Sequence, residues 1–297
     1  MRFLIILLAA LAAWPAQAAL NIFSTVPEWA ALAQEIGGER VKVFAATHGM
    51  QDPHRIDARP SLIARVRNAD LLLATGAELE VGWLPVVQRE SGNLRIQTGQ
   101  PGYFEAAAFV RMLEVPGKLD RAGGDVHADG NPHIQTDPRN FLLIGEALAA
   151  RLALVDPANA AAYRAGYAAF AERLRGSIAR WEKQAAPLRG AAVISQHKGW
   201  AYLYDWLGLR EVGTLEPLPG VEPSAAHLAR IRDQAAASKP RMVIRAAYNP
   251  GRPAEWFSAE TRVPVVVLPF TVGGGGRAQD IVGLFDETIE RLLQAGK

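Results

Sequence analysis

The chain has 297 residues, of which 32 are basic and 30 acidic, so its formal net charge at neutral pH is only +2. With 49% hydrophobic and 21% charged residues and no cysteine, the composition excludes a disordered chain, a disulfide scaffold and any thiolate metal site. The small net charge argues against a nucleic-acid binder that acts through a broad basic surface, and the length allows one large domain or two smaller ones.

Residues 1–19 have the pattern of a secretory signal peptide. Arg2 supplies the positive start, residues 3–13 form a short apolar core, and Ala16-Gln17-Ala18 is an A-x-A cleavage pattern. The apolar run is shorter than the roughly 20 residues that a membrane span needs. The alternative is a buried N-terminal strand or helix. We therefore expect an exported protein of a bacterial periplasm, with no stable membrane insertion after cleavage and no cysteine to carry a lipid anchor.

Short apolar runs rich in β-branched residues recur along the rest of the chain and alternate with helical patterns such as 28–36 and 61–68. Continuous apolar character indicates strands that are buried on both faces, and the alternation predicts α/β units with mostly parallel sheets. The expected strands are 20–25, 41–46, 70–75, 94–98, 191–195, 212–215, 241–246 and 263–268.

A long helical pattern interrupts this alternation. Asp156 is a candidate cap, Pro157 stands at the first helical position, and aromatic and aliphatic residues recur at spacings of three or four from Tyr163 to Trp181. The pattern predicts a helix from Pro157 to Ala185, about 43 Å long, that connects two lobes as a rigid strut. The alternative is two ordinary helices with an unmarked break. The expected domains are a signal peptide at 1–19, an N-terminal α/β lobe at 20–155, a linker helix at 156–187 and a C-terminal α/β lobe at 188–297.

Three of the six histidines follow strands or stand in Pro- and Gly-rich loops, and they come from both halves of the chain. His54 and His133 are in such loops, and His197 follows the apolar run 191–195 directly. Ligands of open α/β sheets sit beyond the carboxyl ends of the strands, so these imidazoles are candidates for convergence in a cleft. Three imidazoles with one further group suffice to bind Zn²⁺. The alternative for each histidine alone is a solvated or hydrogen-bonded role.

The other three histidines are weaker candidates. His48 precedes the loop of His54, and His227 stands in a helical pattern as a surface residue. His127 is either a plain loop residue or an accessory ligand near His133.

Several motifs occur in the order that one known family shows, and they span most of the mature chain. They are Asp52-Pro53-His54, Pro60-Ser61-Leu62, the run 68–76, Asn131-Pro132-His133 with Asp137-Pro138, Gln196-His197 with Tyr202-Leu203, and Pro219-Gly220-Val221-Glu222-Pro223-Ser224. With them, the chain resembles the zinc- and manganese-type substrate-binding proteins of bacterial ABC transporters.

The resemblance implies two α/β lobes bridged by one rigid helix, with a metal ion held between them. By motif position, His54 and His133 are the ligands of the first lobe and His197 is the ligand of the second. The family usually adds a carboxylate just after the last strand, where this chain has Thr271. The fourth ligand therefore stays open between water, Asp280 and another residue.

The absence of a carboxylate at position 271 affects which metal ion we expect the site to bind. Three imidazoles without a carboxylate favour Zn²⁺ over Mn²⁺, which prefers more oxygen ligands. The family's loop rich in histidine and acid is reduced here to Asp120, Asp125, His127 and Asp129 within residues 118–130, and it is a candidate for a small capture loop.

The predicted function is capture of Zn²⁺ and its delivery to an ABC importer by a monomer that is not an enzyme. Its partners would be the permease and its ATPase. One alternative is a secreted zinc hydrolase with water at the open fourth position, for which Asp52 and Asp137 are the nearest candidate bases. Another is a zinc-buffering or adhesion protein on the same fold.

Overall fold

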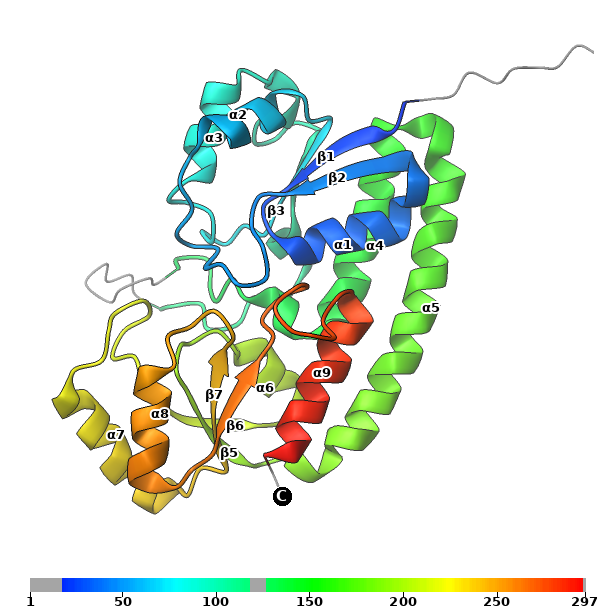
Figure 1. Cartoon of the computed structure of the whole chain (residues 1–297). Coiled ribbons are helices and arrows are strands. Elements are labelled where there is room, and N and C mark those ends of the chain that lie inside the picture. The colour runs from blue at the N-terminus through cyan, green and yellow to red at the C-terminus, as the bar shows by residue number, and fades with distance from the viewer. Residues whose placement is uncertain (1–17, 118–126, 296–297) are drawn as a thin grey trace, which may run out of the picture.

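The computed structural model describes residues 18–117 and 127–295 (Figure 1). Residues 1–17, which make up most of the predicted signal peptide, lie outside the described residues. The described chain forms two α/β lobes, each built on a parallel sheet of four strands, as expected. Within these ranges, the structure contains no helix that combines the length and the apolar character needed to cross a membrane.

The first lobe has the strand order β2-β1-β3-β4. All its strand pairs are parallel, and every residue of β3 is buried. Its strands are β1 (Leu20–Ser24), β2 (Val41–Ala45), β3 (Leu71–Ala74) and β4 (Tyr103–Glu105), and its helices include α1 (Pro27–Gly37), α2 (Pro60–Arg67) and α3 (Leu84–Ser91).

The strand predicted at 94–98 is wrong, because Leu94–Ile96 forms a 3-10 turn and the fourth strand begins at Tyr103. The side chain of Asn93 accepts a hydrogen bond from the backbone N–H of Arg95, which curls the chain at this point. Such local bonds from asparagine compete with an extended ladder.

The second lobe repeats this topology, with the order β6-β5-β7-β8 and parallel pairs throughout. The sequence shows no corresponding repeat. The strands are β5 (Ala192–Ser195), β6 (Arg210–Thr214), β7 (Met242–Ala246) and β8 (Val265–Leu268), and the helices are α6 (Ala201–Leu207), α7 (Ala225–Ser238), α8 (Arg252–Thr261) and α9 (Ile281–Gln294).

The predicted long helix is present and unbroken. Helix α5 (Ala160–Ala185) has 26 residues, and a 3-10 turn at Pro157–Asn159 leads into it. It runs along one side of both lobes, next to α4 (Pro138–Val155) (Figure 1). The apolar stripe from Tyr163 to Trp181 supplies its buried face. The Tyr163 hydroxyl also donates a 2.6 Å hydrogen bond to Asp156, which fixes the start of the helix.

Helices α4 and α5 also form a core that the two lobes share. The ring of Phe141 on α4 lies 5.4 Å from that of Trp29 on α1 and 6.1 Å from that of Phe285 on α9. The ring of Trp181 on α5 lies 5.3 Å from that of Phe285. Helix α1 belongs to the first lobe and α9 to the second, so the lobes are packed together through the helices rather than only connected by a strut.

Candidate metal centre

His54, His133 and His197 come together between the two sheets. Their ring centroids are separated by 5.1 Å for His54 and His133, 5.5 Å for His133 and His197, and 6.0 Å for His54 and His197. One ring nitrogen from each lies within 4.8 Å of the other two. The sequence therefore predicted the three side chains that converge, although their positions are up to 143 residues apart.

The backbone around each histidine is held by local hydrogen bonds. His197 follows β5 directly, where the carboxyl ends of the parallel strands face the first lobe. The N–H of His54 donates to Asp52 Oδ1 at 3.0 Å, and the N–H of His133 donates to Asn131 Oδ1 at 3.0 Å. The Asp-Pro-His and Asn-Pro-His motifs thus form the same kind of turn, in which the side chain of the first residue accepts a hydrogen bond from the N–H of the histidine.

Two of the three imidazoles are oriented by carboxylates. Nδ1 of His54 lies 2.8 Å from Asp52 Oδ1, and Nδ1 of His197 lies 2.8 Å from Glu216 Oε2. Burial opposes ionisation of Asp52, but its hydrogen bonds and its electrostatic attraction to His54 outweigh burial and lower the pKa of the carboxyl. With hydrogen on Nδ1, each ring presents the lone pair of Nε2, and Nε2 of His54 is buried without a hydrogen-bond partner among the described residues. Such carboxylate partners fix the tautomer and the basicity of metal-binding histidines.

His133 has a different environment. Its side chain is buried against the ring of Phe270 at 5.0 Å, and its Nδ1 is buried without a hydrogen-bond partner among the described residues. Burial lowers the pKa of His133 well below its usual value, and the neighbouring histidines lower it further. The ring is therefore neutral at neutral pH, which is the form that binds a metal ion.

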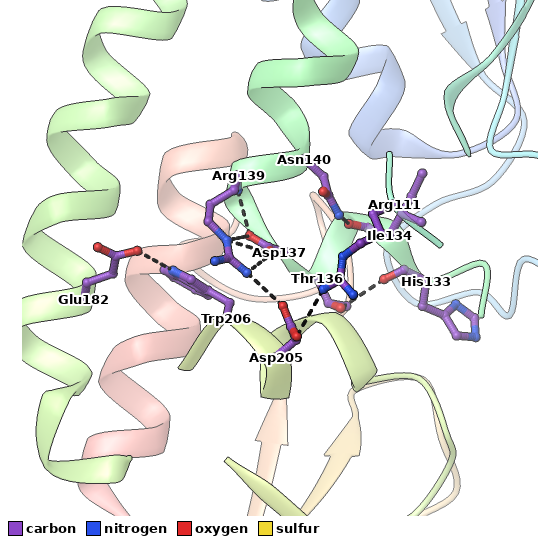
Figure 2. Close-up of polar contacts among 10 residues, drawn as sticks. All are labelled: Arg111, His133, Ile134, Thr136, Asp137, Arg139, Asn140, Glu182, Asp205 and Trp206. Atoms are coloured by element: carbon purple, nitrogen blue, oxygen red, sulfur yellow. Dashed lines mark hydrogen bonds and ion pairs between the residues drawn. The ribbon is translucent and has the colours of Figure 1, made fainter. Parts of the chain in front are cut away.

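A polar network supports the backbone next to His133 (Figure 2). Asp137 caps helix α4 and holds the guanidinium of Arg139 through both carboxylate oxygens. Arg139 also contacts Asp205 on α6 of the second lobe at 3.2 Å, and Arg111 contacts the same carboxylate at 3.3 Å. The imidazole of His133 points away from this network in Figure 2. Asp137 is thus part of a structural ion network rather than of the histidine cluster.

Asp280, the residue named from the sequence as a candidate fourth ligand, does not belong to the cluster of three ring nitrogens in the described residues, and Thr271, at the family's carboxylate position, has another partner. The Thr271 hydroxyl donates a hydrogen bond to Glu28 Oε2 on α1. Asp280 is exposed and caps α9 by accepting a 2.7 Å hydrogen bond from the N–H of Gly283. Burial raises the pKa of Glu28 to about 7, although the Thr271 bond opposes this.

The remaining histidines differ in their distance from the cluster. The His127 ring lies 5.4 Å from that of His54, so it is next to the site. His48 is exposed and accepts a hydrogen bond from the N–H of Met50, and His227 lies on α7 with Nε2 3.0 Å from the Thr214 carbonyl. Of the other candidates in the capture loop at 118–130, Asp120 and Asp125 lie outside the described residues, and Asp129 is an exposed residue of a turn.

Two carboxylates that make contacts at or near the site were not identified from the sequence. Glu216 follows β6 at the carboxyl end of the strand, and that position alone could have marked it as a candidate. Glu28 stands in the first turn of α1, where an acid is common because it interacts favourably with the helix dipole, so nothing in the pattern marked it out.

Comparison with known proteins gives consistent matches. The family model described as "ZnuA: Zinc-uptake complex component A periplasmic" matches residues 22–295. The high-affinity zinc uptake system protein ZnuA of Paracoccus denitrificans is 25% identical over 268 residues, covering 78% of each chain. The manganese ABC transporter substrate-binding lipoprotein PsaA of Streptococcus pneumoniae is 21% identical over 85% of this chain and 80% of that protein.

Solved structures share the fold. A crystal structure of ZnuA superposes with a TM-score of 0.79 at 24% identity and covers 94% of this chain and all of that one. The Mn-bound periplasmic metal binding protein from Candidatus Liberibacter asiaticus gives a TM-score of 0.77 at 18% identity, with the same coverage.

Proposed function

The chain belongs to the ZnuA family of periplasmic zinc-uptake components, and from this membership we propose that it captures Zn²⁺ between its two lobes and delivers it to an ABC importer. The proposed ligands are His54, His133 and His197. The observation that carries the proposal is the convergence of one ring nitrogen from each of these residues within 4.8 Å. Zn–N bonds of about 2.0–2.1 Å place two nitrogens of a tetrahedral site about 3.4 Å apart, so rings whose nitrogens lie within 4.8 Å need only small side-chain movements to surround one ion.

The choice of Zn²⁺ over Mn²⁺ rests on the donor atoms. The names of the relatives refer to zinc uptake and to manganese transport, so what these names have in common is a divalent metal ion. Three neutral imidazoles suit Zn²⁺, whereas Mn²⁺ favours oxygen ligands. Asp52 and Glu216 act through the histidines that they orient, and water would complete a tetrahedral site.

The proposed mechanism is capture followed by handover. The lobes at 20–155 and 188–297 close on the ion, and the linker at 156–187 together with α4 limits their relative motion because both lobes pack against these helices. We place the mature protein in the periplasm as a monomer, with a permease and its ATPase as partners.

The alternative of a zinc hydrolase requires a base that can activate a metal-bound water. Both candidate bases already have partners, since Asp52 accepts hydrogen bonds from His54, and Asp137 is paired with Arg139. These contacts favour binding over hydrolysis.

Metal analysis of protein purified without chelators tests the proposal. We expect about one zinc per chain in the wild type. Little zinc should remain in the triple variant His54→Ala, His133→Ala and His197→Ala. The double variant His48→Ala and His227→Ala is the matched control and should retain the metal. An unchanged zinc content in the triple variant would contradict the site, and zinc-dependent hydrolysis of ester or peptide substrates would favour the alternative.

A further inference from the structure

The motif at 219–224 begins within a turn, Glu216 to Gly220, that is bonded directly to one of the three histidines. Oε2 of Glu216 accepts a hydrogen bond from Nδ1 of His197 at 2.8 Å and another from the N–H of Gly220 at 2.8 Å. Gly220 has a φ of +76°, a left-handed conformation that residues with a Cβ adopt at a cost. The turn from Glu216 to Gly220 therefore holds the carboxylate against His197.

The same turn is bonded to the first lobe. Arg55, which directly follows His54, donates a hydrogen bond from Nη2 to the carbonyl of Gly220 at 3.1 Å. One continuous path thus leads from Arg55 to Gly220, then through Glu216 to His197. It connects the chain next to a ligand of the first lobe with a ligand of the second.

A second connection between the lobes, also next to the histidine cluster, is of a different kind. The buried side chain of Asn131, which positions His133, donates a 2.9 Å hydrogen bond to the carbonyl of Lys198, next to His197. The Tyr202 hydroxyl donates a 2.8 Å bond to the carbonyl of Asn131. The side chains of Asn131 and Tyr202 are buried, whereas Arg55 is exposed and bonds to an exposed glycine. The Arg55 side is therefore the easier one to open.

We propose that Arg55 and the Glu216–Gly220 turn form a latch that positions Glu216 on His197 in the closed cleft and thereby sets how long the metal stays bound. The proposal rests on the function proposed above. When the lobes separate at this side, the turn loses its bond to Arg55, and Glu216 is no longer held over His197 from the first lobe. The imidazole then loses the partner that orients its lone pair, and the ion leaves faster.

The test is the rate of zinc dissociation into an excess of a chromophoric chelator, together with the equilibrium affinity by competition. Arg55→Ala should release zinc faster by about three- to tenfold, because it removes one solvent-exposed hydrogen bond, and a typical net hydrogen bond has an effect of this size. Arg55→Lys should have a smaller effect, since its ammonium can still donate. Arg89→Ala is the matched control, because Arg89 is an exposed arginine of the same lobe that pairs with its neighbour Glu90. It should release zinc at the wild-type rate.

A double-variant cycle separates positioning from a general loosening of the fold. If Arg55 acts through Glu216, then Arg55→Ala should add little to the faster release already caused by Glu216→Gln. The thermal midpoint of metal-free Arg55→Ala should stay close to that of Arg89→Ala. A wild-type dissociation rate in Arg55→Ala overturns the latch, and so do effects of Arg55→Ala and Glu216→Gln that multiply independently. Both results leave the three-histidine site intact, whereas zinc retention by the triple histidine variant would remove the proposed function itself.

Discussion

Thr271 and Glu28 form a hydrogen bond between the two lobes, from the loop after the last strand of the second lobe to the first turn of α1. Thr271 stands where the related binding proteins are expected to carry a carboxylate ligand, and here its hydroxyl is directed to a buried acid instead. The pKa of Glu28 is raised to about 7, chiefly by burial. This contact connects the packing of the two lobes with the protonation of one side chain.

Replacement of Glu28 by glutamine should change how stability depends on pH. The pKa of Glu28 rises from 4.5 to about 7 on folding, so the folded state binds more protons than the unfolded state between these values. The contribution of protonated Glu28 to the free energy of unfolding is therefore fully present below about pH 4.5 and is lost as the pH rises through about 7. Because glutamine does not ionise, Glu28→Gln should be more stable than wild type at pH 8, by up to about 3 kcal/mol, and should lose this advantage near pH 5.

Thermal or urea unfolding of the metal-free protein at both pH values measures this difference. Glu35→Gln is a suitable control, because Glu35 lies on the same helix and forms an ion pair with Arg173 near the surface. A stability difference between Glu28→Gln and wild type that is the same at pH 5 and pH 8 would show that Glu28 stays ionised in the fold.

Zinc affinity should decrease as the pH falls from about 7.5 to about 5.5, because protons compete with the ion for imidazole nitrogen. The decrease should be shallower than three independent imidazoles would produce. The pKa of His133 lies well below its usual value, so this ring is already neutral and has no proton for zinc to displace. Competition titrations across this range give the number of protons taken up per zinc released. A flat profile would rule out histidine ligands, and uptake of about three protons would contradict a neutral His133.

The carboxylates that orient His54 and His197 should contribute to zinc affinity without contacting the ion. Asp52→Asn and Glu216→Gln should each weaken binding by about 10- to 100-fold, the usual effect of losing such a partner. Asp57→Asn is the matched control, since Asp57 is an exposed acid in the same loop as Asp52. Isothermal titration calorimetry or chelator competition measures the change. Affinities of the two variants equal to that of Asp57→Asn would mean that the carboxylates only stabilise the loops.

The shared core predicts that both lobes unfold together. Phe141 is fully buried between Trp29 of α1 and Phe285 of α9, so Phe141→Ala should destabilise the whole chain by about 3–5 kcal/mol. Leu143→Ala on the same helix should have a small effect, because Leu143 is half exposed. Calorimetry should show one transition in both variants. Two separate transitions, with only one shifted by Phe141→Ala, would mean that the lobes are thermodynamically independent.

Local patterns in the sequence were sufficient to predict most strands and the long helix, and the order of the family motifs singled out the three histidines whose rings come together. The strands of both lobes are short continuous apolar runs, and such runs are visible without knowledge of the fold. The strand predicted at 94–98 is wrong because the Asn93 side chain accepts a hydrogen bond from the Arg95 N–H, and this bond decides the local conformation. That Leu94 is exposed is a consequence of the turn and could not be read from its apolar character.

The histidine partners were less accessible to sequence analysis, for a geometric reason. Asp52 is two residues from His54, whereas Glu216 is 19 residues from His197 and reaches it only because β5 and β6 are neighbours in the sheet. The contact of Glu28 with Thr271 spans 243 residues and depends on how two separate lobes are packed. Contacts of this kind follow from tertiary structure, which the order of residues does not display.

The loop before His54 and the glycine run at 273–276, which follows β8, are in direct backbone contact. Gly49 is buried, and a Cβ placed on it would lie 2.1 Å from the backbone carbon of Gly273. A side chain at position 49 would thus push the two loops apart without altering any of the three histidines. A graded series of Gly49→Ala, Gly49→Ser and Gly49→Val should shift the protein stepwise toward open forms while all three imidazoles remain. Because the chain has no cysteine, fluorophores attached to one engineered cysteine in each lobe can report that opening directly.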